Sequence, residues 1–530
     1  MSNKRIFSND DIIEIKRLTA QDGLSSRKIA EIYGVGKSTI GDLLRKETYT
    51  EFWEEEDTKP TAGGNIHNPL AHRKQLKGNK FVFTSAQNNT YVHNGFLKAL
   101  LSYCEAEGAE LICGRYLYNK NGYQGGKNDI WFDPKVRPYL LAEGRTIAKD
   151  LVWCGELNIL PSAVNPLSGL QNYTNEQSSI VPHAKMQLES MPTPKHDRAR
   201  LMYTTGTITQ RNYINRKEGQ KASHDHIFGA VVVEVDEEGD WFVRQLHAES
   251  DTGTFYDLDS KYESSGKITR NIAIEAVNYG DLHSDSIAPD VEYACWEGKG
   301  NILDTLKPRY QLLHDVLSQS RRSHHNIKCP LYMFKQFKME EESVEEEVLL
   351  TTKLIEKLDR PFSERVVVDS NHDRALARFL IEQDFKKDPV NAVFMLKMLL
   401  ATYESVGSRD NFHTFEYACR LVNSNMGNVR FLRVDESFKV AGNIECGAHS
   451  DFGNNGGRGS ILSFQKLGTK HNIGHSHSCG IKAGVYQSGM SGDLDQKYNK
   501  GGSSWSHSHI LTYENGKRTI ITQKGKKWRG

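Results

Sequence analysis

The feature that most limits how this chain can fold is a set of five short segments in its C-terminal half, each rich in histidine, aspartate or asparagine. Several of them directly follow an apolar, strand-like run, as DSNHD follows RVVV. Loops at strand ends are places where side chains from distant parts of a chain converge. We therefore expect a fold that gathers the five segments in one place: GDLH at 280–283, LHDV at 313–316, DSNHD at 369–373, GAHSD at 447–451 and IGHSH at 473–477.

From residue 80 onward, runs typical of strands alternate with runs typical of helices. The strand FVFTSA, a helix over 94–107 and the strand AELICGRY form a βαβ unit, and further helices are expected over 307–320 and 341–358. The apolar runs IFGAVVVEVD and DWFVRQLHA, joined at a Glu-Glu-Gly turn, predict a β-hairpin. The alternation predicts an α/β (α+β) fold class rather than an all-α or all-β one.

Residues 9–46 have the pattern of three short helices, the last two joined by a Gly-Val-Gly turn. Ser25 is placed to cap the second helix, and Gly34 permits the left-handed turn after it. The pattern resembles the helix-turn-helix of resolvases and transposases. The third helix would then present four residues to a DNA groove, namely Lys37, Ser38, Thr39 and Arg45. The alternative is a small helical bundle that packs on the main body or mediates assembly.

Composition divides the chain into four parts. Residues 1–50 form the helix-turn-helix module, and residues 51–79, an acidic cluster followed by proline and glycines, form a linker. Residues 80–265 are an α/β and β region of unknown role, in which we place no metal ligands. Residues 266–530 carry the five segments and end in a basic tail, KRTIITQKGKKWRG, whose tryptophan could stack on a base or whose charges could simply be solvated.

The composition also argues against several classes of protein. No apolar run approaches the roughly 18 residues that cross a bilayer, and the N-terminus lacks the apolar stretch of a signal peptide, so we expect a cytoplasmic protein with no membrane partner. The eight cysteines are scattered without a CxxC pair, which argues against a disulfide framework or a structural zinc site. Because the formal net charge is only +1, any surface for nucleic acid must be local.

The five segments supply the residue types that a pair of divalent cations needs. Such a pair requires a bridging carboxylate, neutral imidazoles on either side, and open positions for water and phosphate. One HxH or one NHD segment is usually a surface turn, but five donor segments in this order are a much stronger indication. The sequence therefore predicts a two-metal site.

In order and local context, the segments resemble the calcineurin-like metallophosphoesterase family, whose pattern is D-x-H, GD, GNH(D/E), H and GHxH. The resemblance covers about residues 270 to 485 and implies a four-layer αββα sandwich behind the N-terminal module. Position by position, it implies a first metal held by Asp281, His283, Asp315 and His477, and a second held by Asp315, Asn371, His449 and His475. It makes His372 the candidate general acid, with Asp373 counted beside it as catalytic.

Two departures from the family pattern concern glycines. His314 stands where the family has the glycine before Asp315, and Ser370 stands where it has the glycine before Asn371. Neither change removes a ligand. They leave Asp315 the least certain assignment, with Asp304 and Asp290 as rivals in the same stretch of sequence.

Further residues are candidates for contacts to nucleic-acid phosphates. Arg321 and Arg322 precede a histidine pair, of which His325 could lie at the rim of the site. Arg458 lies in a glycine-rich loop over 453–459, where backbone N–H groups can approach an anion; the alternative is an ordinary flexible turn.

The family includes phosphatases, nucleotidases, cyclic-nucleotide phosphodiesterases and DNA nucleases, so flanking sequence must select the substrate. The N-terminal module and the basic tail favour DNA, and the segments most resemble DNA-degrading nucleases of large tailed phages, relatives of double-strand-break repair exonucleases. We expect metal-dependent DNA hydrolysis with Mn²⁺, or else Mg²⁺ or Fe, in a homo-oligomer that is a dimer or larger and acts in the host cytoplasm if phage-encoded. The alternatives are a phosphomonoesterase acting on nucleotides or phosphoproteins and a non-catalytic DNA-binding protein with a structural metal.

Overall fold

The computed structural model describes residues 7–20, 24–44, 73–118, 130–195, 197–408 and 412–530, and the chain forms two compact units, residues 1–69 and 70–530. The first unit contains α1 (Asn9–Ala20), α2 (Ser26–Tyr33) and α3 (Lys37–Leu44). The Ser25 side chain accepts a hydrogen bond from the N–H of Lys28, and Gly34 ends α2 at φ 63°. The expected cap and turn between these helices are therefore confirmed.

A small core of its own holds the first unit together. Ile12 and Ile15 of α1 pack with Ile29 of α2 and with Ile40 and Leu43 of α3. The expected linker over 51–79 lies mostly outside the described residues.

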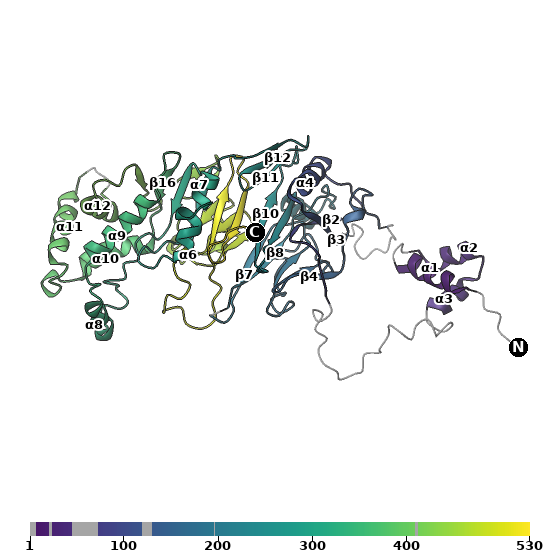
Figure 1. The fold of residues 1–530 in the computed structure, drawn as a ribbon, viewed down its shortest axis with the longest axis horizontal. Helices are drawn as coiled ribbons and strands as arrows, with labels where there is room; N and C mark the ends of the chain where they lie inside the picture. The colour runs from purple at the N-terminus through teal and green to yellow at the C-terminus, as the bar shows by residue number, and fades with distance from the viewer. Residues whose placement is uncertain (1–6, 21–23, 45–72, 119–129, 196, 409–411) are drawn as a thin grey trace. The chain divides into compact units, whose positions relative to one another are not determined.

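The second unit is built from two facing layers of β-structure (Figure 1). One layer is a single sheet of eleven strands, in the spatial order β1 (Lys74–Gln75), β4 (Gly144–Ala148), β5 (Leu151–Cys154), β6 (Ser178–Val181), β8 (Arg200–Thr204), β7 (Leu188–Met191), β21 (Gly480–Lys482), β22 (Val485–Gln487), β20 (Lys470–Ile473), β19 (Ile444–Glu445) and β18 (Lys439–Val440).

The facing layer consists of two smaller sheets. The four-stranded sheet has the order β10 (Trp241–His247), β9 (Gly229–Val235), β2 (Lys80–Gln87) and β3 (Glu110–Tyr116). The six-stranded sheet has the order β17 (Val429–Phe431), β16 (Glu364–Val367), β15 (Tyr310–Leu313), β14 (Ala276–Asn278), β23 (Ser508–Thr512) and β24 (Arg518–Thr522). A separate three-stranded sheet comprises β11 (Phe255–Asp257), β12 (Ser260–Tyr262) and β13 (Ile268–Thr269).

Helices cover the outer faces of this facing layer. Those packed with the six-stranded sheet in one core are α6 (Pro289–Glu292), α7 (Ile302–Leu306), α9 (Val344–Lys357), α10 (Asn371–Glu382), α11 (Ala392–Ser405) and α12 (Thr414–Val422). The helix α4 (Asn94–Glu107) covers the four-stranded sheet. The remaining helices are α5 (Lys217–His224), α8 (Pro330–Lys338) and α13 (Ile461–Gln465).

The alternation of side chains along the strands explains this layering. On β14, Val277 belongs to the core shared with the helices, whereas its neighbour Ala276 belongs to a core shared with Val440 and Ile444 of the eleven-stranded sheet. Successive strand residues point to opposite faces, so strands that are apolar at every position must be covered on both sides. The mixed α/β class expected from the sequence is confirmed.

Strands from before and after residue 265 pair in the same sheet. Gly480 and Ile481 of β21 pair with Glu189 and Leu188 of β7. The two ranges that composition separates, 80–265 and 266–530, thus fold as parts of one body.

Among the local predictions, the helices near 94–107 and 341–358 and the β9–β10 hairpin are confirmed. The helix expected over 307–320 is wrong, because residues 310–313 form β15 between two parallel neighbours, β14 and β16. Pairing on both sides in a central sheet outweighs the weak local preference of a short segment.

The basic C-terminal segment is not a free tail. Residues 518–522 form β24, and Arg518 is buried and donates a hydrogen bond to the carbonyl of His471 at 2.8 Å. Trp528 is also buried, and its indole N–H donates to the carbonyl of Gly300. The expectation that this tryptophan could stack on a base is therefore wrong, since its ring already packs in the core below the helices.

No helix among the described residues is long and apolar enough to span a bilayer. The eight cysteines are all free thiols, and most of them are buried, as expected from their scattered positions.

A buried carboxyl on α9 holds a turn that borders the site described below. Glu347 is fully buried, and its carboxyl accepts hydrogen bonds from the N–H groups of Ser320 (2.6 Å) and Arg321 (3.2 Å). Burial, together with the negative charge of Asp285, raises the pKa of Glu347 to about 7.

We predict that Glu347→Gln changes how stability depends on pH. The folded state keeps a proton on Glu347 that the unfolded chain loses near its ordinary pKa, so this contribution is present at low pH and disappears as pH rises through about 7. Relative to wild type, the glutamine variant should gain on the order of 3 kcal/mol between pH 4 and pH 8. Urea unfolding at both pH values measures this; Glu345→Gln on the same helix is the control, and a difference independent of pH would contradict the prediction.

Candidate metal centre

Each of the five donor segments follows the carboxyl end of a strand, and these strands belong to two sheets that face each other. Three of these strands, β14, β15 and β16, are parallel neighbours in the six-stranded sheet, and the other two, β19 and β20, are parallel neighbours in the eleven-stranded sheet. Because the carboxyl ends of parallel strands meet at one edge of a sheet, the segments that follow them come together. The convergence expected from the sequence is confirmed for all seven candidate ligands.

One group of donors contains the residues expected around a first metal. Ligand atoms of Asp281, His283, Asp315 and His477 all lie within 4.8 Å of one another, and all four residues are buried. The Nε2 atom of His477 is 3.2 Å from Nε2 of His283 and 3.2 Å from Oδ2 of Asp281. Imidazole nitrogens and carboxylate oxygens thus point at one small volume.

A second group contains the residues expected around a second metal. Ligand atoms of Asp315, His449 and His475 lie within 4.8 Å of one another, and Nε2 of His449 is 3.1 Å from Oδ2 of Asp315. Asn371 lines the same cavity as Asp315, and its Oδ1 atom is buried without a hydrogen-bond partner. Asp315 belongs to both groups, which is the position of a bridging carboxylate.

Asp304 and Asp290, the alternatives to Asp315 as a metal ligand, have surroundings that do not suit a ligand. Asp304 accepts hydrogen bonds from Arg360 and Asn301 at the foot of α7, and Asp290 is exposed in α6. Neither belongs to a buried donor group.

The backbone at the donors is held in a conformation that ordinary residues avoid. His283, Asp315, His475 and His477 have φ values of 50°, 45°, 73° and 59°. Left-handed backbone at residues other than glycine costs free energy and clusters at functional sites. Tertiary hydrogen bonds maintain it, such as that from the N–H of His283 to the carbonyl of Asp315 at 2.8 Å.

A glycine allows one of these turns to approach the carboxylates closely. A side chain at Gly474 would collide with Oδ1 of Asp281. The following residue, His475, donates its backbone N–H to Oδ2 of Asp281 at 2.8 Å. This close approach explains the glycine at the start of the GHSH sequence.

The charges of the group depend strongly on one another. Burial is the largest influence and opposes ionisation of Asp281 and Asp315, but the neighbouring histidines, His449 foremost, together outweigh it and hold the pKa of both carboxyls below the usual value. Burial also opposes protonation of His449, but Asp315 and Asp281 raise its pKa to about 9. Two buried anions thus attract positive charge to the point between them.

Two other imidazoles of the donor groups, those of His283 and His475, stay neutral. Burial, with a smaller contribution from His372, lowers the pKa of His283 to about 3, and burial also lowers the pKa of His475. Neutral imidazoles and ionised carboxylates are the forms that bind metal ions. Together with the unpartnered oxygens of Asn371 and Asp281, this donor set fits a divalent cation and suits Mn²⁺, Mg²⁺ or Fe.

The candidate general acid, His372, lies at the edge of this group. Its backbone N–H is 3.4 Å from Oδ1 of Asp315, and its Nδ1 is 2.8 Å from the carbonyl oxygen of Ser318. With a proton on Nδ1, which the carbonyl requires, the other ring nitrogen is free for chemistry in the cavity that His372 lines.

Asp373 does not reach this cavity. It is buried, accepts hydrogen bonds from the N–H of Leu317 and the hydroxyl of Ser370, and begins α10. Burial, reinforced by the charge of Asp315, raises its pKa well above the usual value. Its role is to fix the turn that carries Asn371 and His372, so its expected place among the reacting groups is wrong.

A cavity of about 620 Å³ opens above the donors. Besides Asp315, Asn371 and His372, it is lined by residues that sequence reasoning did not single out, chiefly Tyr498 and Trp505. They lie in the long segment between β22 and β23, which has no motif, so nothing in the sequence marked them.

Comparison with known proteins finds a relative from a phage. The chain is 38% identical to "Protein A1" of Escherichia phage T5 over 484 residues, which is 89% of this chain and 86% of the phage T5 protein. It belongs to the family of phage T5 protein A1. No protein-family model matches the chain, and no solved structure matches it.

In this member of the A1 family, His314 contacts the ring of His449 at Nδ1, whereas Asp315 contacts the same ring at Nε2. Nδ1 of His314 is 3.3 Å from Nδ1 of His449, and burial, with the neighbouring His449, lowers the pKa of His314 to about 4. A neutral His314 is placed to accept a hydrogen bond from Nδ1 of His449, and this contact would hold the His449 ring with Nε2 toward Asp315. The histidine that interrupts the metallophosphoesterase pattern thus has a positioning role.

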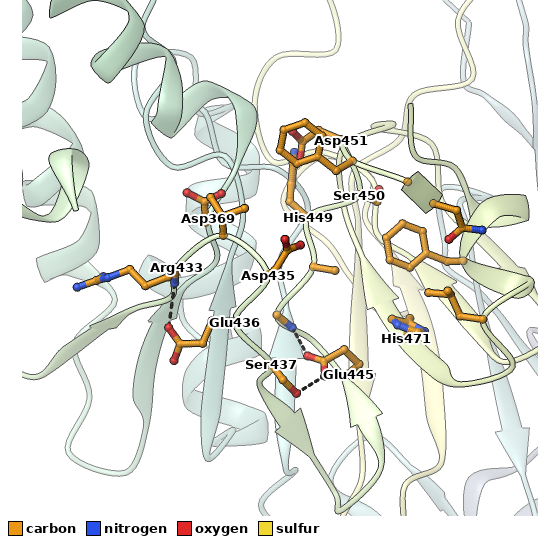
Figure 2. Close-up of a pocket in the computed structure, with 18 of the residues that line it drawn as sticks. Asp369, Arg433, Asp435, Glu436, Ser437, Glu445, His449, Ser450, Asp451 and His471 are labelled. Carbon is orange, nitrogen blue, oxygen red and sulfur yellow. Dashed lines mark hydrogen bonds between the residues drawn. The ribbon is translucent and has the colours of Figure 1, made fainter. Parts of the chain in front are cut away.

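A second cavity, of about 290 Å³, lies on the side of His449 and Ser450 that faces β18 and β19 (Figure 2). Three of its carboxylates are engaged: Asp369 and Asp451 bind Arg374, and Glu445 accepts from the N–H groups of Phe438 and Gly447. These contacts stiffen the loop that carries His449.

Two of the expected phosphate contacts are wrong. Arg321 and Arg322 are buried, and they bind Glu346 and Asp388 respectively. Ion pairs within the fold therefore occupy the guanidinium groups that were expected to face DNA. In contrast, His325 is exposed, and Arg458 is exposed and lines the cavity.

The residues expected to read DNA lie at the start of α3 in the first unit. Lys37 and Ser38 are exposed and Thr39 is half-buried, while Arg45 lies outside the described residues. Their contact with DNA stays a prediction.

We predict that His314→Ala weakens metal binding while the protein still folds. Loss of the acceptor frees His449 to rotate and change tautomer, and loss of such a partner typically costs 10- to 100-fold in metal affinity. Titration calorimetry with Mn²⁺ measures the effect. His471→Ala, a buried histidine on β20 outside the donor groups, is the matched control, and equal affinity of wild type and His314→Ala would refute the positioning role.

Proposed function

We propose that this chain is a metal-dependent nuclease that hydrolyses phosphodiester bonds in DNA. The observation that carries the proposal is the position of Asp315, shared by two groups of buried donors, with His372 beside it at the floor of an open cavity. A structural metal site is closed, so it needs neither a cavity above its ligands nor a free imidazole at their edge.

Each donor has a part in this proposal. Asp281, His283, His477 and Asp315 would hold one cation, and Asp315, Asn371, His449 and His475 a second. Bound there, the cations would neutralise phosphate charge and lower the pKa of water toward neutrality. The ring of His372, anchored through Nδ1 to Ser318, would deliver a proton from Nε2 to the departing oxygen, and Arg458 at the rim would attract the phosphate.

The proposal extends to the fold and the setting. Two facing β-layers with helices outside the six-stranded sheet support the assignment to a metallophosphoesterase sandwich, and the donor order along the chain supports it independently. Mn²⁺ is the proposed working ion. Because the A1 relative is a phage protein, the host cytoplasm is the proposed setting. We also propose that the protein acts as a homo-oligomer.

The first test is cleavage of linear duplex DNA by the full chain with Mn²⁺, Mg²⁺ or EDTA. We expect degradation that requires the metal, that disappears in Asp315→Asn, and that falls by about 10²- to 10⁴-fold in His372→Ala. Glu238→Gln is the control, because Asp236, Glu238 and Asp240 form another acidic group on the surface.

Two outcomes would replace the proposal. If DNA stays intact under every condition while p-nitrophenyl phosphate is hydrolysed, the protein is a phosphomonoesterase. If neither is turned over while DNA is bound, it is a binding protein with a structural metal.

DNA as substrate predicts a role for the first unit. Deletion of residues 1–69, a separate compact unit, should lower the rate on long duplex DNA by about tenfold or more and leave hydrolysis of bis(p-nitrophenyl) phosphate unchanged, because only the long substrate can contact α3. Rates on both substrates, measured at two salt concentrations, test this. Equal losses on both substrates would mean that the first unit supports the fold instead.

A further inference from the structure

The cavity above the donors has an aromatic side that the hydrolysis of a phosphate does not itself require. Trp505 lies beside His477, with ring centroids 4.3 Å apart and the planes at 79°. Tyr498 lies next along this side, 5.8 Å from Trp505, and is 61% exposed. Both rings line the same cavity as Asp315 and His372.

Trp505 is held firmly by its backbone neighbours. Ser503 exchanges two backbone hydrogen bonds with Thr193, at 2.8 and 3.0 Å. On the other side, the N–H of Ser506 donates to the carbonyl of His477, and a side chain at Gly489 would collide with the carbonyl of Ser506. The backbone on both sides of Trp505 is therefore fixed, and it is built against the segment that carries a candidate metal ligand.

Most of the remaining lining residues are polar, Gly459 and Ile461 excepted. Arg458 is the cation of the cavity, and Ser460, Ser476 and Gln487 contribute hydroxyl and amide groups. Flat aromatic faces next to an arginine and a phosphate-hydrolysing centre match a ligand that has both a planar ring and a phosphate. Among biological phosphodiesters, a nucleotide has this chemistry.

Burial of the donors restricts how such a ligand can arrive. Asp281 and Asp315 are at most 1% exposed and His477 is 5% exposed, so a phosphate must descend into the cavity to reach them. A cavity of about 620 Å³ is the size of a small-molecule pocket and cannot contain stacked base pairs. Enzymes that act on a nucleotide in such a pocket take it from a single strand or out of the duplex.

We infer that the cavity is a nucleotide pocket, in which the base beside the scissile phosphate leaves its partner strand and stacks on Trp505, with Tyr498 at the rim. This inference rests on the proposed function and specifies its substrate: an unpaired nucleotide, in a single strand or at a frayed end. The aromatic side accepts every base, because each base has a π-face.

The test compares cleavage at a normal nucleotide and at an abasic one within the same labelled single strand. We expect the full chain with Mn²⁺ to cut beside the abasic position roughly 5- to 100-fold more slowly, the range that one stacked base contributes. It should also cut the single strand faster than the blunt duplex of the same sequence. Trp505→Ala should remove the discrimination, whereas Trp505→Phe and Tyr498→Phe should keep most of it.

The ratio of the two cleavage rates, beside the normal and beside the abasic nucleotide, distinguishes stacking of the base on Trp505 from packing of the indole against His477. If Trp505→Ala slows both bonds equally, the indole only positions His477 and the inference is overturned. It is also overturned if wild type cuts both bonds alike, a result that leaves the nuclease proposal intact. Tyr403→Ala on α11, at an exposed aromatic outside the cavity, should change neither rate.

Binding without cleavage gives a separate readout. In EDTA, a single strand with 2-aminopurine should lose fluorescence on binding wild type and retain it with Trp505→Ala. Quenching that persists in the variant would place the base elsewhere and overturn the inference. Absence of any DNA cleavage by wild type with Mn²⁺ would instead refute the nuclease proposal itself.

Discussion

Two carboxylates, Asp281 and Asp315, lie in the interior where two β-layers meet, and much of the surrounding structure serves to make their charge tolerable. An isolated buried carboxylate costs several kcal/mol or more relative to water. Here the cost is offset by His449 and His477, by backbone N–H groups, and by turns held in left-handed backbone so that donors face inward. A site of this kind fits an incoming cation far better than it fits water.

The donor residues could be predicted from the sequence because their types and order carry chemical meaning. All seven lie together as expected, and of the three aspartates considered for the bridging position only Asp315 belongs to a buried donor group of the described residues. The general layering could also be anticipated, since a fully apolar strand such as RVVV must be covered on both faces.

What could not be predicted depended on partners that are distant in the sequence. The strand at 310–313 has an unremarkable local pattern and is defined by its neighbours β14 and β16. The sequence alone makes Arg321 and Arg322 resemble a phosphate-binding pair. Their acidic partners in the structure lie twenty or more residues away along the chain. Similarly, Arg518 of the basic C-terminal segment is a buried residue of β24, and Trp505 belongs to a segment without any motif.

The sharing of one sheet by early and late strands has a consequence for synthesis. β7 and β8 are made well before β20, β21 and β22, and the six-stranded sheet receives β23 and β24 later still. Non-local pairing of this kind folds slowly and leaves apolar faces exposed until the last strands arrive. We therefore expect that a nascent chain, or one that lacks β20 to β24, does not assemble the donor groups, so that their chemistry begins only after these strands have left the ribosome.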